Sequence, residues 1–244
     1  MSMSDKEKAQ VGDKIEAGNA SWSFSGGTAK GFSEHVKKSV PFYEEGHDLI
    51  LKFSDYFIDD QSIAYEIGSS TGTLTRKLAQ RNKHRQTKIF GIDSQEAMTI
   101  QALKETKEKL PNMEFITANA FEYEFLPSDL IISYYVIQFI PSRSRQDLIN
   151  KIYKTLNWGG AFIWFEKVRA PDARFQDYIN GLYTEYKLDS GYNSEEIISK
   201  SRSLKRVLEP FSTYGNLGLM ERAGFVDVMP IMKYLCFEGY IAIK

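Results

Sequence analysis

A short loop of small residues between an apolar run and a helical pattern constrains this chain more than any other feature. Residues 63–67 are β-prone and apolar except for Glu66, residues 68–72 are glycine, serine and threonine, and helical spacing starts at Leu74. A strand, a tight turn and a helix in this order form the geometry that holds nucleotide-like ligands. Gly68 permits a turn that a side chain would block, the serines let backbone N–H groups approach a ligand, and the helix N-terminus favours an anion.

An acidic residue follows at the distance that such a site needs. Asp93 ends the next predicted strand, 88–92, and lies 25 residues after Gly68, near the spacing of a ribose-binding carboxylate. The alternative for Asp93 is to cap the helix that follows it. Polar ends of two later strands follow at Asn119 and near Tyr134, in the order that a nucleoside site requires. For the loop taken by itself, an ordinary strand–helix turn without a ligand is the alternative.

Strands and helices alternate through the middle of the chain. Strands are predicted at 63–67, 88–92, 113–117, 129–134 and 161–166, with helices at 46–57, 73–81, 95–109 and 143–156. This alternation predicts right-handed crossovers and a parallel sheet, and therefore an α/β fold.

After Lys167 the pattern changes. Residues 170–212 form an insertion rich in aromatic and charged residues, with helices near 172–186 and 194–208. The insertion is too short for a separate domain, so we expect it to cap the site or to pair two subunits. The chain then ends with a helix near 214–222 and strands at about 226–235 and 238–243.

The N-terminal part differs from the rest in composition. We expect residues 1–31 to be a mobile tail, because the first 30 residues are polar and rich in serine, glycine and lysine. Trp22 and Phe24 would then either anchor a lid or pack on the surface. Residues 32–244 would form a single domain.

Size, charge and cysteine content limit the class of protein. A chain of 244 residues with 42% hydrophobic residues can bury the core of one α/β domain. The net charge of −1 gives no overall field that attracts nucleic acid or an anionic membrane, so direct binding to either is not expected. The single cysteine, Cys236, excludes an intramolecular disulfide and fits a reducing cytoplasm. No apolar run reaches membrane-spanning length.

With these motifs the chain resembles the class I S-adenosylmethionine (SAM)-dependent methyltransferases. The first motif of that family, Glu-x-Gly-x-x-x-Gly, is present as Glu66, Gly68 and Gly72. The segment 156–160 resembles the family's Leu-x-Pro-Gly-Gly turn, with Trp158 in place of the proline. Within the family the chain is similar to the carboxy-SAM synthases, which act in tRNA wobble-uridine modification. Matches to them run from about residue 32 to the C-terminus and include Ser39–Tyr43, Gln138–Phe139, Glu166–Lys167, Gly191–Tyr192, Arg202–Ser203 and Ala223–Phe225.

The resemblance implies a fold, a cofactor and a way of working. The expected fold is a Rossmann-like seven-stranded sheet, mostly parallel with the last strand antiparallel, and with helices on both faces. The expected cofactor is SAM, or S-adenosylhomocysteine or carboxy-SAM in its place. The expected partners are a small-molecule substrate and a second copy of the chain.

The resemblance also implies cofactor-binding positions: Tyr43, Gly68, Ser69, Ser70, Gly72, Asp93, Ser94, Asn119, Ala120 and Tyr134. Asn119 replaces an acid that contacts the adenine amino group in the family, and an amide oxygen can accept the same hydrogen bond. Tyr134 replaces an asparagine of the synthases. Arg202 matches the arginine that holds the extra carboxylate of carboxy-SAM, to which a guanidinium fork is suited. The alternative for Arg202 is a solvated charge on a helix.

The residues leave the catalytic groups and the reaction open. His35, Tyr135 and Glu166 are each candidates for a general base toward a hydroxyl or amine acceptor. The alternatives are that Glu166 pairs with Lys167 at the end of a strand and that Tyr135 lines a pocket. No histidine and cysteine spacing suggests a metal site.

Three functions are compatible with these features. The first is a SAM-dependent methyltransferase that transfers a one-carbon group to a small-molecule acceptor. The second is a carboxy-SAM synthase that uses prephenate as the carboxyl donor. The third is a non-catalytic SAM-binding protein.

Overall fold

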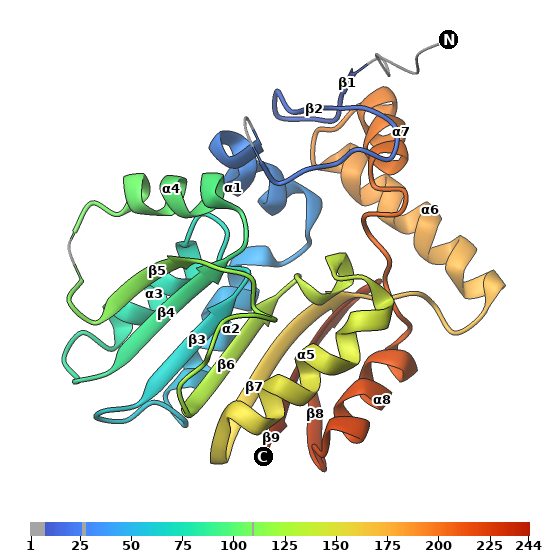
Figure 1. The fold of residues 1–244 in the computed structure, drawn as a ribbon. Helices are drawn as coiled ribbons and strands as arrows, with labels where there is room; N and C mark the ends of the chain where they lie inside the picture. The colour runs from blue at the N-terminus through green and yellow to red at the C-terminus, as the bar shows by residue number, and fades with distance from the viewer. Residues whose placement is uncertain (1–7, 26–27, 109) are drawn as a thin grey trace.

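The centre of the molecule is a seven-stranded sheet with helices on both faces (Figure 1). The computed structural model describes residues 8–25, 28–108 and 110–244. The strands of the sheet, in spatial order, are β5 (Met113–Thr117), β4 (Lys88–Asp93), β3 (Ile63–Ile67), β6 (Ser128–Tyr134), β7 (Leu156–Lys167), β9 (Phe237–Ile243) and β8 (Asp227–Tyr234). Neighbours from β5 to β7 pair in parallel, and β9 runs antiparallel between β7 and β8. The predicted fold is therefore confirmed.

The central strands are buried on both faces. In β3, β6 and β7, apolar residues follow one another without exposure, as in Leu130 to Ile132 and Ala161 to Phe165, all of which are fully buried. Continuous apolar runs of this kind are typical of parallel strands that helices cover on each side.

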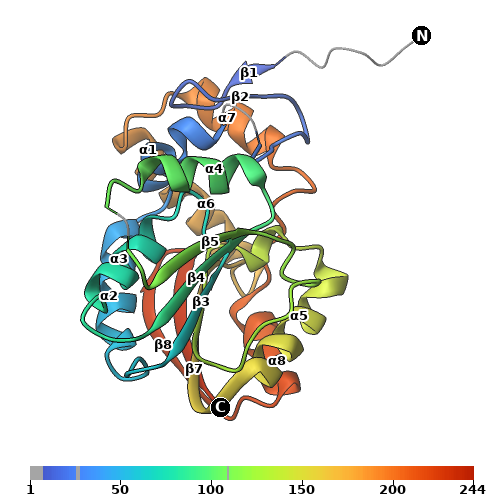
Figure 2. The same cartoon turned by 60° about the vertical axis from the view of Figure 1, so that its left-hand side comes forward.

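Two hydrophobic clusters hold the helices to the sheet. One cluster contains Ile50 of α2 (Tyr43–Ser54) and Leu74 of α3 (Thr73–Arg81). The other contains Leu148 of α5 (Ser142–Thr155) and Leu219 of α8 (Thr213–Ala223). The two pairs of helices therefore cover opposite faces of the sheet (Figure 2).

The remaining helices lie beyond the carboxyl ends of the parallel strands (Figure 1). They are α1 (Thr28–Ser39), α4 (Glu96–Glu105), the 3₁₀ turn η1 (Ile137–Phe139), α6 (Ala173–Asp189) and α7 (Ser194–Ser203). Helices α6 and α7 form the predicted insertion, in which α7 ends at Ser203 rather than near residue 208. The predicted helix 95–109 ends at Glu105, and its last residue, 109, lies outside the described residues.

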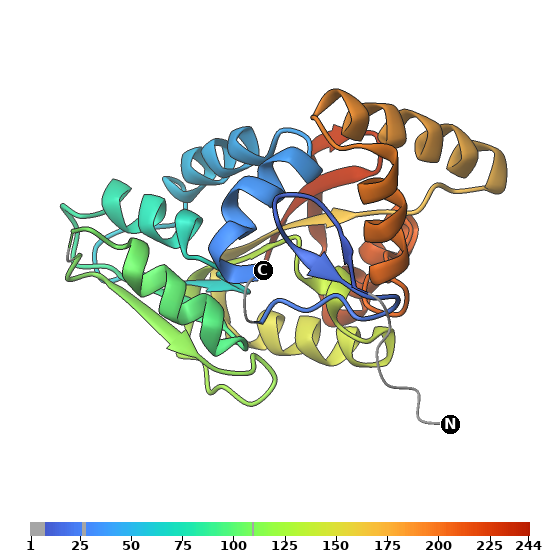
Figure 3. The same cartoon turned by 90° about the horizontal axis from the view of Figure 1, so that it is seen from above.

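Residues 8–25 differ from the expected mobile tail. They form a hairpin of β1 (Ala9–Gln10) and β2 (Glu16–Ala17) that lies over the carboxyl end of the sheet (Figure 3). Val11, Ile15 and Trp22 are buried and pack with residues 204 and 207 that follow α7. Apolar contact therefore orders this segment. Residues 1–7 of the expected tail lie outside the described residues.

Candidate functional site

A cavity of about 1100 Å³ lies at the carboxyl ends of β3, β4, β6 and β7. The chain leaves β3 toward β4 on one side and returns to β6 on the other, so this is the topological switch point of the sheet. Ligands of open α/β sheets bind at such points. The upper wall comes from residues 22 and 24, from α1 and from the insertion.

Most of the sequence-predicted site residues meet in this cavity. Nine of the ten expected cofactor positions line it: Tyr43, Gly68, Ser69, Ser70, Asp93, Ser94, Asn119, Ala120 and Tyr134. Arg202, His35 and Tyr135 also line it. Gly72 and Glu166 do not.

The loop after β3 depends on its two glycines. Gly68 has a φ of +74° and Gly72 a φ of +76°, a region that residues with a side chain rarely adopt. A Cβ at Gly68 would lie 2.9 Å from Val136 Cγ1, and a Cβ at Gly72 would lie 3.0 Å from Ala102 Cβ, with still closer contacts to Val136 and Phe115. Gly72 therefore supports the loop from behind, where it begins α3.

The backbone N–H groups of Gly68, Ser69 and Ser70 donate within the protein, which differs from the expectation that they face a ligand. The N–H of Gly68 donates to Ile92 O at 2.7 Å and that of Ser69 to the same oxygen at 3.0 Å. The N–H of Ser70 donates to Asp93 Oδ2 at 2.8 Å. These three residues therefore offer a ligand their small surface, carbonyl oxygens and the serine hydroxyls rather than N–H groups.

Asp93 connects this loop to the start of the next helix. Its Oδ2 accepts from Ser70, and its Oδ1 accepts from the N–H of Gln95 at 2.8 Å. The N-cap of α4 is Gln95, so Asp93 is not the helix cap of the alternative interpretation. Each carboxylate oxygen has a second lone pair, which leaves two acceptors for the hydroxyls of a ribose. Burial raises the pKa of Asp93.

Glu66 provides a second carboxyl group in the same end of the cavity. It is 4% exposed, and the hydroxyl of Thr75 donates to its Oε2. Burial raises the pKa of Glu66 to about 8, with the charge of Asp93 as a further cause. A cation bound beside it would favour the ionised form.

Asn119 lies at the exposed rim of the site. Its Oδ1 accepts from the N–H of Phe121 at 3.0 Å, so the amide holds a turn. One lone pair of that oxygen is left for an adenine amino group.

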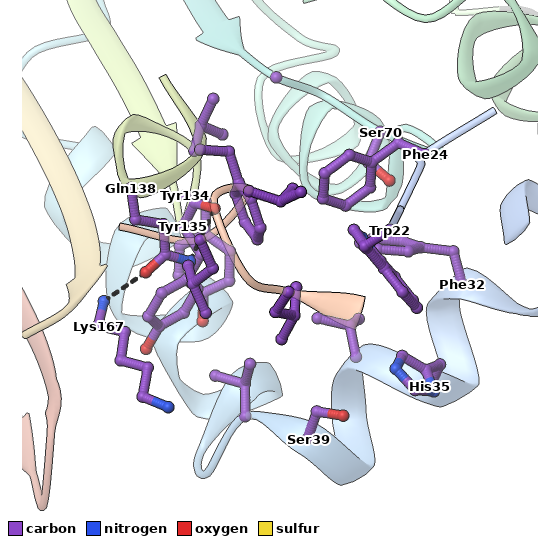
Figure 4. Close-up of a pocket in the computed structure, with 18 of the residues that line it drawn as sticks. Trp22, Phe24, Phe32, His35, Ser39, Ser70, Tyr134, Tyr135, Gln138 and Lys167 are labelled. Atoms are coloured by element: carbon purple, nitrogen blue, oxygen red, sulfur yellow. Dashed lines mark hydrogen bonds between the residues drawn. The ribbon is translucent and has the colours of Figure 1, made fainter. Parts of the chain in front are cut away.

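Tyrosines form the wall between the loop and the rest of the cavity (Figure 4). The ring of Tyr134 packs 5.0 Å from that of Tyr43 and 4.7 Å from that of His47. The hydroxyl of Tyr134 donates to Tyr43 O at 2.7 Å and is therefore used in the wall. His47 is buried without a hydrogen-bond partner, and burial lowers its pKa to about 3, so its imidazole is neutral.

The three candidate bases have different surroundings. The hydroxyl of Tyr135 is buried without a hydrogen-bond partner, and its backbone has a φ of +61°. His35 Nδ1 lies 3.0 Å from Asp13 Oδ2, and its Nε2 lies 2.7 Å from Lys200 Nζ. Burial and the charge of Lys200 lower the pKa of His35 to about 4. Both ring nitrogens are thus engaged in fixing the N-terminal hairpin to α1 and α7.

Glu166 lies outside the cavity. It is 2% exposed, and its Oε1 accepts from the N–H of Ile137, so it positions the turn η1. Burial raises its pKa to about 8. The expected ion pair with Lys167 is absent from the described residues, because successive side chains of a strand point to opposite faces.

A group of cations at the other end of the cavity was missed by the sequence analysis, apart from Arg202. It comes from the end of β7, from α6 and from α7, and comprises Lys167, Arg169, Lys187, Lys200, Arg202 and Lys205. The carboxylate of Glu196 lines this end and accepts from the backbone N–H of Asn193 in a capping box. The carboxylate of Asp13, whose charge also acts on Lys200, pairs with His35 and Lys38. The cavity is therefore acidic at the loop end and basic at the opposite end.

Comparison with known proteins identifies the family to which this cavity belongs. Residues 64–160 match the model of a methyltransferase domain family. The carboxy-S-adenosyl-L-methionine synthase of Staphylococcus epidermidis is 36% identical, over 91% of this chain and 97% of its own length. The enzyme of the same name from Helicobacter hepaticus is 34% identical, over 97% of this chain and 98% of its own.

Solved structures share the fold at low identity. Human N-acetylserotonin methyltransferase in complex with SAM has a TM-score of 0.59 and 15% identity, over 88% of this chain and 54% of its own. Magnesium protoporphyrin IX methyltransferase from Synechocystis, with S-adenosylhomocysteine bound, has a TM-score of 0.59 and 14% identity, over 85% of this chain and 86% of its own. The chain is a SAM-dependent transferase of the methyltransferase fold and belongs to the family of the carboxy-S-adenosyl-L-methionine synthases.

Proposed function

We propose that this transferase makes carboxy-SAM by moving a carboxyl group from prephenate to the methyl carbon of SAM. The observation that carries the proposal is the polarity of this cavity, with Glu66 and Asp93 at one end and Arg202 among the cations at the other. A cationic cofactor and an anionic donor can each face groups of opposite charge there. The names of the relatives that match along nearly the whole chain support it.

The residues of the loop end fit SAM. Asp93 has acceptors for a ribose diol, and Glu66 is a carboxyl group beside which a cationic group would be stabilised. The ring of Tyr43 forms one part of the wall here, and the small residues of the loop 68–70 form another and leave room for a ligand. When bound, SAM supplies a methyl group activated by a sulfonium. The chain aligns the two reactants and keeps water away from them.

The proposed reaction balances without a further reactant. The donor loses its carboxyl group and a hydroxide as its ring becomes aromatic, a carbon–carbon bond forms at the methyl carbon, and the displaced proton joins the hydroxide as water. Arg202 is the residue that we propose for the new carboxylate, because its guanidinium lines the cavity and makes no ion pair within the described residues.

The direct test is mass spectrometry of the cofactor after incubation with SAM and prephenate. We expect a product heavier than SAM by one carboxyl group. Arg202→Ala should lose most of this turnover, whereas Arg174→Ala should not, because Arg174 lies on α6 outside the cavity. SAM that stays unchanged in the presence of prephenate would contradict the proposal.

A specific observation favours methyl transfer to a small-molecule acceptor as the second candidate. Tyr134 replaces the asparagine of the synthases, and its hydroxyl is held in the wall. Formation of S-adenosylhomocysteine with an acceptor, without carboxy-SAM, would support this candidate. SAM binding without either product would support the non-catalytic function.

We further propose that the protein works as a homodimer in the cytoplasm. Helix α6 has no buried residue and carries four apolar residues between 43% and 59% exposed, Phe175, Tyr178, Leu182 and Leu188. An apolar surface of this kind favours pairing.

The buried free thiol of Cys236 is compatible with a reducing compartment. Separately, no helix within the described residues is long and apolar enough to cross a membrane.

Sedimentation velocity at micromolar concentration tests the pairing. We expect a dimer, and a monomer for Leu182→Glu, whose charge would have to be buried. A monomeric wild-type protein would contradict the dimer without affecting the proposed reaction.

A further inference from the structure

Two lysines in the basic end of the cavity lie against one aromatic ring. Lys167 ends β7, and Lys187 lies in the last turn of α6. The amine of Lys167 is 4.2 Å from the ring centroid of Tyr183, and that of Lys187 is 4.6 Å from the same centroid. Within the parts of the chain that the structure describes, neither amine makes an ion pair or a hydrogen bond. Both therefore present charge to the cavity.

Two other cations that the fold buries fully or in large part find oxygen partners inside the protein. Arg145 is 1% exposed and donates to the carbonyl oxygens of Ile140, Gln138 and Glu209 at 2.9, 3.2 and 2.6 Å. The guanidinium of Arg76, whose side chain is 20% exposed, donates to Thr71 O at 2.7 Å and to Glu105 Oε2 at 3.1 Å. Because the chain satisfies these cations internally, the two unpaired lysines in the cavity need another explanation.

The surroundings of the two lysines disfavour their charge. Burial lowers the pKa of Lys167, and burial followed by the charge of Lys167 lowers the pKa of Lys187 to about 8. A contact with a tyrosine ring is a weaker partner than a carboxylate. An anion that enters this end of the cavity would stabilise both ammonium groups. Unpaired, partly buried ionisable groups that face a cavity are typical of binding sites.

A third polar group and two apolar rings belong to the same end. The hydroxyl of Tyr135 is buried without a partner, and Tyr135 is 7% exposed. Its ring lies 5.8 Å from that of Phe237, which in turn lies 5.3 Å from that of Tyr183. Figure 4 draws Lys167 and Tyr135 to one side of the cavity and Trp22 and Phe24 to the other. Tyr135 also packs 6.5 Å from Tyr43, which connects this end to the cofactor end.

We propose that Lys167 and Lys187 bind a carboxylate of the second substrate, a small organic acid with an unsaturated ring. The two ammonium groups supply the charge, and Tyr135 supplies a directional hydrogen bond. The ring of the acid packs on Tyr183 and Phe237. Arg202, on α7, remains available for the carboxylate of the product. This inference rests on the proposed function only in requiring that the second substrate is an acid.

The test measures binding rather than turnover. Lys167→Met and Lys187→Met keep an unbranched apolar side chain and remove the charge. Lys52→Met is the matched control, because Lys52 is exposed on α2 and does not line the cavity. The probes are 3-phenylpropionate and its neutral analogue 3-phenylpropanol, measured by calorimetry in the presence of SAM. SAM affinity is measured separately for each variant.

We expect the wild-type protein to bind the acid at least about tenfold more tightly than the alcohol. Each cavity variant should lose at least about tenfold in affinity for the acid and keep its affinity for the alcohol and for SAM, and Lys52→Met should behave as wild type. Equal binding of acid and alcohol by the wild type, or unchanged acid binding in the two variants, would overturn the inference. A parallel loss of SAM affinity in the variants would also overturn it, because the lysines would then support the site as a whole.

The outcomes separate the subsite from the reaction. If wild-type protein forms no carboxy-SAM with prephenate but binds the acid through the two lysines, the proposed reaction is wrong and the carboxylate subsite stands. If carboxy-SAM forms and the lysine variants bind the acid as wild type does, the reaction stands and the subsite is wrong.

Discussion

Tyr134 is the cavity residue that replaces an asparagine of the synthases. Its ring and hydroxyl fit into the cavity wall because residue 46 is glycine. A Cβ at Gly46 would lie 3.1 Å from Cζ and 3.2 Å from Cε2 of Tyr134, and closer still to its hydroxyl oxygen. That hydroxyl donates to Tyr43 O at 2.7 Å, so moving it away from an added Cβ would break this hydrogen bond. Gly46→Ala should therefore displace Tyr134 from the wall of the cavity.

Three contributions set the size of the effect. Overpacking a well-filled site costs about 1–3 kcal/mol. Loss of the hydrogen bond to Tyr43 adds about 1 kcal/mol. Alanine in place of glycine inside a helix recovers about 1 kcal/mol. Gly46→Ala should thus lower the free energy of unfolding by roughly 1–3 kcal/mol, which corresponds to a fall in Tm of roughly 2–4 °C per kcal/mol for a chain of this length.

A double-mutant cycle with Tyr134→Phe isolates the clash. Phenylalanine removes the hydroxyl and leaves only the tight contacts to the ring, so Gly46→Ala should be close to neutral in that background, with a coupling of about 2 kcal/mol. Gly181→Ala is the control, because Gly181 lies in α6 with nothing within 4 Å of the added Cβ, and it should stabilise slightly. Urea unfolding of the four proteins measures the cycle. Equal destabilisation by Gly46→Ala in both backgrounds would refute the reasoning.

Three further predictions concern cofactor binding. Gly68→Ala should weaken SAM binding at least about tenfold. Gly159→Ala is the control and should not weaken it, because Gly159 has a similar φ of +81° but open space around the added Cβ. Calorimetry that finds equal SAM affinities for the two variants would contradict this prediction. Asp93→Asn leaves one acceptor oxygen for the N–H groups of Ser70 and Gln95, which now have two, and should cost roughly tenfold or more in SAM affinity in the same assay. Glu66, whose pKa is raised to about 8, is mostly protonated at neutral pH, so binding of cationic SAM should release a proton and tighten between about pH 6 and 8. Calorimetry in buffers of different ionisation enthalpy should detect that proton in the wild type, and Glu66→Gln should abolish it.

The fold could be predicted because its signals are local. Each strand of the parallel half is an apolar run followed by a helical pattern, and the structure places β3 at Ile63–Ile67 and β5 at Met113–Thr117, as predicted. The antiparallel last strand was predicted only from the resemblance, because pairing between distant segments leaves no mark on either of them. The hairpin of residues 8–25 was missed, because Val11, Ile15 and Trp22 are too sparse to show a period.

The site was predictable only where its residues belong to one motif. The loop and Asp93 are close in sequence, and their hydrogen bond joins the ends of adjacent strands. Lys167 and Lys187 lie on different elements, and only the path of the chain from β7 into α6 brings both amines to Tyr183. The sequence likewise could not show that the N–H groups of the loop donate to β4, because that depends on the register of two neighbouring strands.

The net charge of −1 conceals the property of this molecule that bears most on its chemistry. Acidic and basic groups are separated inside one cavity, with the carboxyl groups of Asp93 and Glu66 at the loop and unpaired amines near Tyr183. In such a partly buried space a cationic cofactor and an anionic substrate attract each other more strongly than they would in water. Each should therefore raise the affinity of the protein for the other by the same factor, because coupling between two ligands is reciprocal. A protein with a net charge near zero can thus bind one pair of oppositely charged ligands selectively, because the affinity depends on the positions of the ionisable groups in the cavity and not on their sum.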